Sequence, residues 1–414
     1  MGVVGLGYVG LATALGLASL GYQVYGLEND SERREKLQQG HMPFREPGMQ
    51  EMLTEMKDSR FRVLEGITGL PDKPEVIFFC VGTPEARDGS TDSRILKEAI
   101  GQVMEGLASD GPVPLVIRST IPPGLVEEEL YPLLDRFPGW ERDYLISNPE
   151  FLRENSALED FLNPDRIVLG GEGESIPEVV EALYQPLKAP IFRVSHRSAS
   201  FIKMASNSLL ATLISFSNEM AALAESLGDI RIAEAFQILR KDRRWREAPM
   251  ASYLHPGCGY GGYCLPKDIR ALRRAGEAAG QSMSLIRTVD CINEGRPGEL
   301  VRRVLKRLGP GNAVGILGLS FKPESGDVRN TPAAGVIRGL REAGCHRILA
   351  YDPLAREEFE KKYPGLVSGY RNSLKEMEME CDLLVIVTGW EEFRGLAGKS
   401  RVPVVDGRYM GEDR

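Results

Sequence analysis

Short apolar runs alternate with helical or polar stretches through the N-terminal half of the chain. Runs that predict strands occupy residues 2–7, 22–28, 76–83, 114–120, 144–150 and 166–171. The segment between the first two runs is apolar with a helical pattern, and it ends at a glycine. Because strands that alternate with helices are typical of parallel sheets covered on both faces, this half is expected to be an α/β domain.

The pattern changes near Phe201. Residues 201–228 contain no proline, and they predict one helix of about 40 Å at 1.5 Å per residue. Apolar residues lie on more than one side of this helix, which predicts burial between domains or between subunits. After Gly311 the alternation resumes, with strands expected at 313–320, 347–352, 382–388 and 402–407.

The expected architecture is therefore α/β, with two Rossmann-like doubly wound domains joined by a long central helix and a helical middle domain. We place the first domain at 1–197, the middle domain at 198–300 and the last domain at 301–414. A chain of 414 residues is long enough for two or three such domains.

Composition narrows the function. The net charge of −8 argues against a general nucleic-acid or membrane-surface binder. The first 27 residues lack charge, but glycines interrupt them and no basic start precedes them, so we expect a folded segment in a cytoplasmic protein. Six scattered cysteines form no disulfide framework. His255, Cys258 and Cys264 lack the spacing of a zinc site, so no metal is expected.

A phosphate-binding turn follows the first strand. "GLGYVG", residues 5–10, lies between that strand and a helix, where Gly5 makes the turn, Gly7 admits a pyrophosphate and Gly10 allows close packing. Glu28 ends the second strand and would accept the ribose hydroxyls. Since its charge repels a 2′-phosphate, NAD is favoured over NADP, although Arg33 and Arg34 lie nearby.

The C-terminal half lacks this glycine spacing, so a second NAD site is not expected there. Its loops carry Lys322, Arg329 and Arg408 directly after predicted strands. Side chains of this kind are either solvated or hold a second phosphorylated ligand at the carboxyl ends of the strands. Spacing alone leaves both readings open.

The chemistry is concentrated around "GGYCLPKD", residues 261–268. A cysteine between two glycines and a Lys-Asp pair is either a small buried hydrophobe or a positioned nucleophile. Lys203 and Asn207 lie four residues apart and share one face of the long helix. With the carboxylates Glu150 and Glu154 they complete a set of thiol, acid-base groups and oxyanion donors.

Eight motifs in register resemble the UDP-glucose/GDP-mannose dehydrogenase family across essentially the whole chain. They are "GLGYVGL" (5–11), "VGTP" (81–84), "STIPPG" (119–124), "NPEFLRENSALEDFLNPDRIVLG" (148–170), "KMASNSLLATLISFSNE" (203–219), "GCGYGGYCLPKD" (257–268), "FKPESGDVR" (321–329) and "VVDGR" (404–408). The resemblance implies oxidation of the C6 alcohol of a nucleotide sugar to a carboxylate, with two NAD⁺ reduced in turn. A cysteine captures the intermediate aldehyde as a thiohemiacetal, which becomes a thioester and is hydrolysed.

The resemblance also implies a role for particular residues. The catalytic set is the nucleophile Cys264, with a pKa lowered by Lys203 or Lys267, the proton acceptor Asp268 with a water bridged by Thr120, the oxyanion donors Lys203 and Asn207, the hydrolytic base Glu150, and Glu154. The NAD set is Gly5, Gly7, Tyr8, Val9, Gly10, Glu28, Arg33, Val81, Gly82, Thr83, Ser119, Thr120, Glu154, Lys267 and Arg329. The nucleotide-sugar set, expected between the domains, is Phe151, Leu152, Arg153, Glu154, Lys203, Asn207, Tyr253, Leu254, Gly259, Gly261, Lys322 and Arg408. A homodimer built on the long helix is expected.

Some positions depart from the family pattern. Tyr263 stands where many members have serine, Leu213 replaces a lysine, and Ala248 replaces an arginine that reaches the neighbouring subunit's sugar. Arg244 or Arg246 would have to substitute for it. "GGYCLPKD" favours UDP-glucose, and GDP-mannose or a UDP-N-acetylhexosamine remains the alternative.

Two readings from other classes compete with this one. A single-step NAD-dependent hydroxy-acid dehydrogenase would explain Lys203 and Asn207 but gives Cys264 and Asp268 no role. A non-catalytic NAD-dependent regulator with Cys264 as a redox sensor would show little or no turnover. The complete set of acid, base and nucleophile favours the enzyme.

Overall fold

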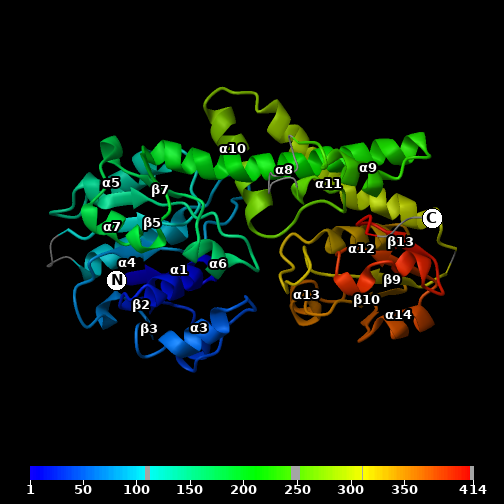
Figure 1. The fold of residues 1–414 in the computed structure, drawn as a ribbon, viewed down its shortest axis with the longest axis horizontal. Helices are drawn as coiled ribbons and strands as arrows, with labels where there is room; N and C mark the ends of the chain where they lie inside the picture. Colours follow the sequence, from blue (N-terminus) through cyan, green and yellow to red (C-terminus); the bar gives the residue numbers. More distant parts are fainter. Residues whose placement is uncertain (108–111, 244–251, 310, 411–414) are drawn as a thin grey trace. The chain divides into compact units, whose positions relative to one another are not determined.

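A computed structural model describes residues 1–107, 112–243, 252–309 and 311–410 (Figure 1). The chain forms two compact units, Met1–Ser206 and Asn207–Arg414. Arg244, Arg246 and Ala248, which were considered for a contact with a neighbouring subunit's sugar, lie outside the described residues.

The first unit contains a doubly wound sheet. Its strand order is β3-β2-β1-β4-β5-β6-β7-β8, and the order reverses direction between β1 and β4, where such sheets bind ligands. The six strands predicted for this half are confirmed. The strands are β1 (Gly2–Val4), β2 (Val24–Leu27), β3 (Phe61–Leu64), β4 (Ile77–Phe79), β5 (Leu115–Ile117), β6 (Leu145–Ser147), β7 (Ile167–Gly170) and β8 (Ile191–Val194).

Helices cover both faces of this sheet. Phe78 packs into the core beneath α1, whereas its neighbours Ile77 and Phe79 pack into the core beneath α4, because successive side chains of a strand point to opposite faces. α3 and α6 pack beside α1. The helices are α1 (Tyr8–Ser19), α2 (Ser31–Gln38), α3 (Met49–Met56), α4 (Arg94–Gly106), α5 (Tyr131–Leu134), α6 (Ala157–Leu162) and α7 (Glu178–Ala182).

The sheet differs from the prediction in two ways. The edge strands β3 and β8 were missed because an edge strand exposes part of its length, and Arg62, Phe192 and Arg193 are exposed. β6 and β7 pair antiparallel through Ser147 and Gly170, although a parallel sheet was expected. The other neighbouring strands in the described part of the sheet are parallel.

The predicted long helix is α8, His196–Leu227, which begins five residues before the predicted start and continues from the first unit into the second. Within the described ranges, α8 is the helix that is long and apolar enough to cross a membrane by length and composition. Buried core helices pass the same test, and 44% of its most apolar window is buried.

The second unit combines helices with a parallel sheet of order β11-β10-β9-β12-β13. The four strands predicted here are confirmed, and the short edge strand β11 was missed. α11 packs on α12, which covers one face of the sheet. The elements are α9 (Ile232–Leu239), α10 (Cys264–Ala278), α11 (Ser284–Leu305), β9 (Val314–Leu317), α12 (Pro332–Glu342), β10 (Ile348–Tyr351), α13 (Arg356–Lys362), β11 (Gly369–Tyr370), α14 (Leu374–Glu380), β12 (Leu383–Ile386) and β13 (Val404–Asp406).

Candidate active site and cofactor site

The glycine turn after β1 has the geometry of a phosphate-binding turn. Gly5 has φ +85°, where an L side chain is strained, and a Cβ there would lie 2.9 Å from Val81 Cγ1. A Cβ on Gly10 would lie 1.8 Å from the carbonyl oxygen of Gly5, so α1 approaches β1 as closely as only glycine permits. A Cβ on Gly7 would meet nothing within 4 Å, which leaves open space beside the backbone for a phosphate.

The N-terminus of α1 suits an anion. Its N-cap residue, Gly7, provides no capping side chain, and its first turn contains no acidic residue. Tyr8 and Val9, both predicted for the cofactor, occupy this turn. The first backbone N–H groups of the helix, and the positive end of its dipole, are therefore available to a pyrophosphate.

Glu28 lies directly after β2 and is 2% exposed. Its carboxylate accepts hydrogen bonds from the backbone N–H of Leu6 at 2.9 Å and of Asp30 at 2.9 Å. The Arg33 guanidinium contacts Glu28 Oε2 at 3.1 Å and is 38% exposed. The ion pair holds the partly exposed Arg33 next to the buried Glu28. Arg33 can therefore contact an adenosine, and Glu28 lies where a ribose would bind.

Two loops at the carboxyl ends of β4 and β5 are hydrogen-bonded to each other. Thr83 Oγ1 donates to the carbonyl of Thr120 at 2.8 Å, and Ser119 Oγ donates to the carbonyl of Val81 at 2.7 Å. The structure thus brings together the predicted cofactor residues 81–83 and 119–120, at the edge of the sheet where Rossmann folds bind ligands.

Lys203 and Glu150 form a buried ion pair. Lys203 Nζ lies 2.9 Å from Glu150 Oε1, and each side chain is 5% exposed. The other oxygen, Oε2, accepts the backbone N–H of Leu152 at 2.6 Å. Glu150 and Lys203 were predicted as a separate base and oxyanion donor, and the structure pairs their opposite charges.

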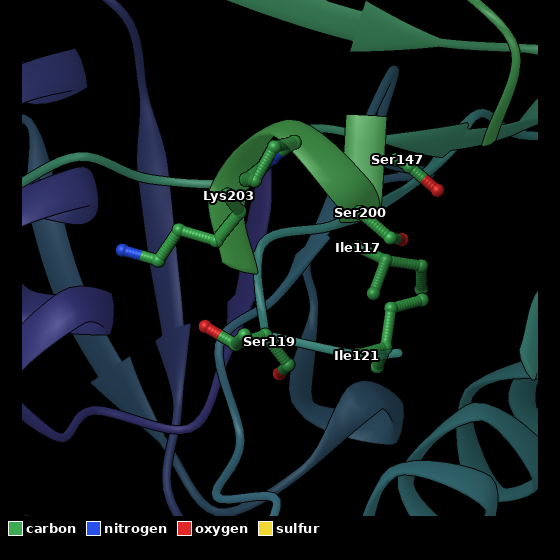
Figure 2. Close-up of a pocket in the computed structure, with 8 residues that line it drawn as sticks. Ile117, Ser119, Ile121, Ser147, Ser200 and Lys203 are labelled. Atoms are coloured by element: carbon green, nitrogen blue, oxygen red, sulfur yellow. The ribbon is translucent and has the colours of Figure 1, made fainter. Parts of the chain in front are cut away.

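A small pocket lies beside Lys203 (Figure 2). It is lined by α8 and by the chain at and after the ends of β5 and β6. Four of its lining residues carry hydroxyl groups: Ser119, Thr120, Ser147 and Ser200. Hydroxyl groups around a small space suit ordered water.

Asn207 lies one helical turn after Lys203 on α8, and it contacts a different acid. Asn207 Nδ2 donates to Asp268 Oδ2 at 2.6 Å, and Lys267 Nζ lies 2.7 Å from Asp268 Oδ1. Asp268 is fully buried. Burial by itself would lower the pKa of Lys267, but the charge and the hydrogen bond of Asp268 outweigh it and raise that pKa. Lys267 therefore remains a cation next to a carboxylate.

Cys264 is the first residue of α10 and is exposed. Lys267 and Asp268 follow it within about one helical turn, so all three lie near the positive end of the α10 dipole. A helix N-terminus and a neighbouring lysine are surroundings in which reactive cysteines are found. Of the six cysteines, Cys80, Cys258 and Cys381 are buried instead.

Tyr263, the departure from the family pattern, contacts two predicted cofactor residues. Lys267 Nζ lies 5.6 Å and the Arg329 guanidinium 4.8 Å from the centre of its ring. Arg329 also pairs with Asp327 at 2.6 Å. Tyrosine at this position therefore supports the two cations through its ring face, which a serine could not do.

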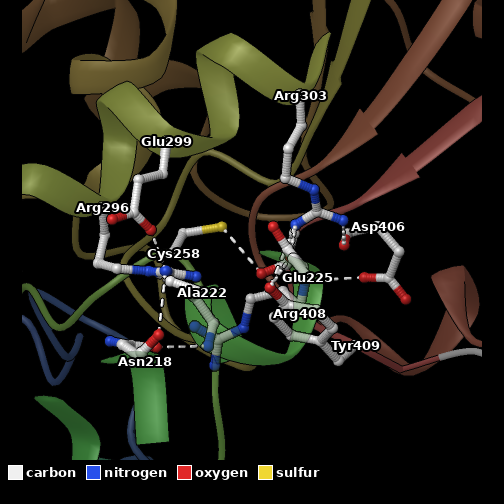
Figure 3. Close-up of polar contacts among 12 residues, drawn as sticks. Asn218, Ala222, Glu225, Cys258, Arg296, Glu299, Arg303, Asp406, Arg408 and Tyr409 are labelled. Carbon is white, nitrogen blue, oxygen red and sulfur yellow. Dashed lines mark hydrogen bonds and ion pairs between the residues drawn. The ribbon is translucent and has the colours of Figure 1, made fainter. Parts of the chain in front are cut away.

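The glycine loop before Cys264 is held by side chains that the sequence did not single out (Figure 3). Asn218 Oδ1 accepts the N–H of Gly257 at 2.7 Å, and Arg296 Nε donates to the Gly257 carbonyl at 3.1 Å. Asn293 Oδ1 accepts the N–H of Tyr260 at 2.7 Å. In the sequence these three residues are polar positions within predicted or apolar-patterned helices. Such positions are usually solvated, so they gave no specific sign of a contact with the loop.

The predicted sugar residues of the second unit lie on or beside this loop. Gly259 has φ +102°, and a Cβ on Gly261 would lie 2.4 Å from a backbone oxygen. Arg408 packs against Gly257, where a Cβ would lie 2.7 Å from its guanidinium. The Lys322 ammonium lies over the Phe321 ring. Tyr253 and Leu254 come directly before the loop, and Leu254 is buried.

The residues considered as metal ligands are hydrogen-bonded within the fold. His255 Nε2 lies 3.1 Å from the carbonyl of Arg408, and Cys258 Sγ donates to the carbonyl of Gly407 at 3.2 Å. Burial, followed by the charge of Arg408, lowers the pKa of His255 to about 4, so the imidazole is neutral. Both residues join the loop to the segment after β13.

The turn after β9, in the C-terminal sheet, resembles the turn after β1, but its acid is bonded to more groups of the protein. Gly318 has φ +91°, and Asp352 accepts the amide N–H that follows the turn at 2.7 Å, as Glu28 does in the first sheet. Asp352 is 6% exposed, and it also accepts the Trp390 indole N–H at 3.2 Å and two amide groups of its own loop. In the described part of the chain Asp352 accepts six hydrogen bonds, whereas Glu28 accepts three, so the oxygens of Asp352 are more fully occupied.

The open turn at Gly7 and the acid Glu28 have the features of an NAD-binding site of the Rossmann type. Family models match three successive segments that together span most of the chain. The NAD binding domain of the UDP-glucose/GDP-mannose dehydrogenase family matches residues 1–188, its central domain 197–295 and its UDP binding domain 315–412. The chain belongs to this family, and its cofactor is NAD.

Similar proteins span nearly the full length of the chain. A UDP-glucose 6-dehydrogenase of Pseudomonas aeruginosa is 37% identical over 99% of this chain and 93% of its own length. The structure of a UDP-glucose dehydrogenase from Pyrobaculum islandicum is 36% identical, with a TM-score of 0.92 over 99% of this chain and 94% of that one. A UDP-D-ManNAc dehydrogenase from Pyrococcus horikoshii is 27% identical, with a TM-score of 0.84 over 100% of this chain and 97% of that one.

Proposed function

We propose that the protein oxidises the C6 alcohol of UDP-glucose to the carboxylate of UDP-glucuronate, in the cytoplasm, through a thioester on Cys264. The observation that carries this proposal is the exposed cysteine at the start of α10, within about one turn of Lys267 and the buried Asp268. A dehydrogenase that stopped at the aldehyde would need no nucleophile there. The names of the relatives at 36–37% identity support UDP-glucose as the sugar.

NAD, when bound at the turn after β1, accepts the hydride of each oxidation. The residues of the chain do the remaining work. Asp268, together with water at Thr120, takes the proton of the C6 hydroxyl, and Lys203 and Asn207 stabilise the oxygen that develops negative charge. The Cys264 thiolate adds to the aldehyde carbon to form a thiohemiacetal.

Loss of the second hydride converts the thiohemiacetal to a thioester. Glu150 then removes a proton from water, which attacks the thioester carbonyl and releases the carboxylate and the thiol. The contact of Glu150 with Lys203 at 2.9 Å supports this role, because it places the base next to the ammonium that would stabilise the oxyanion.

The first test counts NADH. With limiting UDP-glucose and excess NAD⁺, the native enzyme should form two NADH per sugar. One NADH would contradict the thioester route and leave a simple alcohol dehydrogenase. No NADH from UDP-glucose, but two from GDP-mannose or a UDP-N-acetylhexosamine, would keep the family chemistry and change the substrate.

Cofactor choice gives a separate prediction. Glu28→Gln removes the charge that accepts ribose hydroxyl groups and repels a 2′-phosphate. Losing a hydrogen bond to a charged group costs about 1.5–3 kcal/mol, so the KM for NAD should rise roughly 10- to 100-fold. The ratio of kcat/KM for NAD to that for NADP should fall. An unchanged ratio in steady-state kinetics would contradict the assignment of Glu28; Glu32→Gln, an exposed neighbour, serves as the control.

We also propose that the active form is a homodimer built on α8. Leu209, Phe216 and Leu223 are spaced seven residues apart on this helix and are 49%, 44% and 50% exposed. Residues spaced by seven lie along one side of a helix, which forms the apolar seam that a second copy of the helix would cover.

A charged substitution on this seam should separate the subunits. Phe216→Glu places a carboxylate in the proposed contact and should shift the mass measured by light scattering from that of a dimer to that of a monomer. Met379→Glu, at a residue of α14 that is 76% exposed, is the matched control and should leave the mass unchanged. A Phe216→Glu protein that retained the dimer mass would place the contact elsewhere.

A further inference from the structure

One buried carboxylate outside the predicted site holds both the cofactor helix and the loop that follows β6. Glu46 precedes α3 and is 5% exposed. Its Oε1 accepts the backbone N–H of Ala157 at 2.8 Å, and its Oε2 accepts that of Asn155 at 2.9 Å. Tyr8 Oη lies 2.6 Å from Oε2. Glu46 therefore binds three groups from two segments that are far apart in the sequence.

Tyr8 is the first residue of α1, at the end of the helix that faces the phosphate-binding turn. Burial raises the pKa of its phenol, and the hydrogen bond with Glu46 raises it further, so the hydroxyl keeps its proton and donates to Glu46. The same hydroxyl lies 3.1 Å from the carbonyl oxygen of Arg153. The cofactor helix thus contacts the loop directly and also through Glu46.

Among the other anchors of the loop, two backbone hydrogen bonds do not involve α1. The N–H of Leu152 donates to Glu150 at 2.6 Å, and the N–H of Arg153 donates to Asp160 at 2.7 Å. Asn155 has φ +68°, in the left-handed region that asparagine tolerates better than most residues, and its N–H donates to Glu46 from this turn. Glu46 is a shared anchor, because it accepts hydrogen bonds both from the loop and from Tyr8 of the cofactor helix.

We propose that Glu46, through Tyr8, couples NAD binding to nucleotide-sugar binding. The inference rests on the proposed function, in which residues 151–154 contact the sugar and the first turn of α1 contacts the pyrophosphate. A dinucleotide that orders Tyr8 also orders the loop through Glu46. The sugar then binds to a loop that is already in place, and by linkage it increases the affinity for the dinucleotide by the same factor.

The experiment measures this factor with a pair of ligands that cannot react. The Kd of NADH is measured by its fluorescence without UDP-glucose and with saturating UDP-glucose. In the native enzyme the sugar should lower the Kd by about fivefold or more, the lower end of typical coupling. Glu46→Gln places an amide group where three donors converge. The ratio of its two Kd values should therefore fall to within about twofold of one.

Further variants separate coupling from loss of structure. Tyr8→Phe removes the hydroxyl that contacts Glu46 and leaves intact the hydrogen bonds that Glu46 accepts from the amides of Asn155 and Ala157. It should therefore lower the coupling ratio even if Glu46→Gln folds poorly. Asp160→Asn loosens the same loop without touching α1, so it should weaken sugar binding but keep the ratio. Glu51→Gln, an exposed acid on α3, should behave as the native enzyme.

Each outcome has a distinct meaning. A native-like coupling ratio in both Tyr8→Phe and Glu46→Gln would overturn the inference, as would a native enzyme that binds both ligands without coupling. A ratio lost in Asp160→Asn to the same extent would also overturn it, because loop order alone would then explain the effect. If direct titration showed no binding of UDP-glucose to the native enzyme, the proposed substrate would be wrong. The proposed coupling between NAD and UDP-glucose would then be wrong as well.

Discussion

Cys264→Ser should stop the reaction after the first oxidation, so that no more than one NADH forms per UDP-glucose. A serine hydroxyl at the start of α10 is a far weaker nucleophile than a thiolate, and an oxygen ester would have to replace the thioester. The overall kcat for formation of the carboxylate should fall at least about 10³-fold, as expected when a nucleophile is removed. Binding of the nucleotide sugar should change little, because the glycine loop keeps its hydrogen bonds to Asn218, Asn293 and Arg296.

NADH yield per sugar and mass spectrometry of the trapped enzyme would check this prediction. The native enzyme, quenched during turnover, should carry a mass increase on the peptide that contains Cys264. Cys291→Ser provides the control, because Cys291 is also exposed but lies on α11. Two NADH per sugar from Cys264→Ser at a rate near that of the native enzyme would remove the thioester from the mechanism.

Lys203→Met should destabilise the protein and also abolish its activity. The substitution leaves Glu150 buried without its cation at 2.9 Å, and an unpaired buried charge costs about 3–5 kcal/mol in the free energy of unfolding. Activity should be lost in both oxidations, because the ammonium that stabilises the developing oxyanion is gone. Urea denaturation and kcat/KM measure the two effects separately.

The double variant Lys203→Met/Glu150→Gln distinguishes the two roles. A neutral pair in a buried site should recover most of the lost stability, while activity remains absent. If activity returned together with stability, the pair would be purely structural. Lys97→Met provides a comparison: the Lys97–Glu129 pair has side chains that are 36% and 39% exposed, so its loss should cost no more than about 1 kcal/mol.

Sequence alone was sufficient for features that depend on neighbouring residues. The glycine turn, the ten predicted strands and the long helix all follow from local periodicity or from backbone constraints at residues such as Gly5 and Gly10. Glu28 could be recognised as a ribose-binding candidate, because one helix and one strand separate it from the glycine turn and so fix its distance from that turn along the chain. The edge strands β3 and β8 could not, because partial exposure removes the apolar run that marks a buried strand.

Tertiary structure alone decided which groups are paired. Glu150 and Lys203 are 53 residues apart, Asn207 and Asp268 are 61 apart, and Glu46 meets an amide group 111 residues away. No local pattern encodes these contacts, because a hydrogen bond depends on positions in space and the intervening chain can have almost any length. The residue types that the chemistry needs are therefore visible in the sequence, whereas the ion pairs and the backbone anchors that hold them in place are set only when the chain folds.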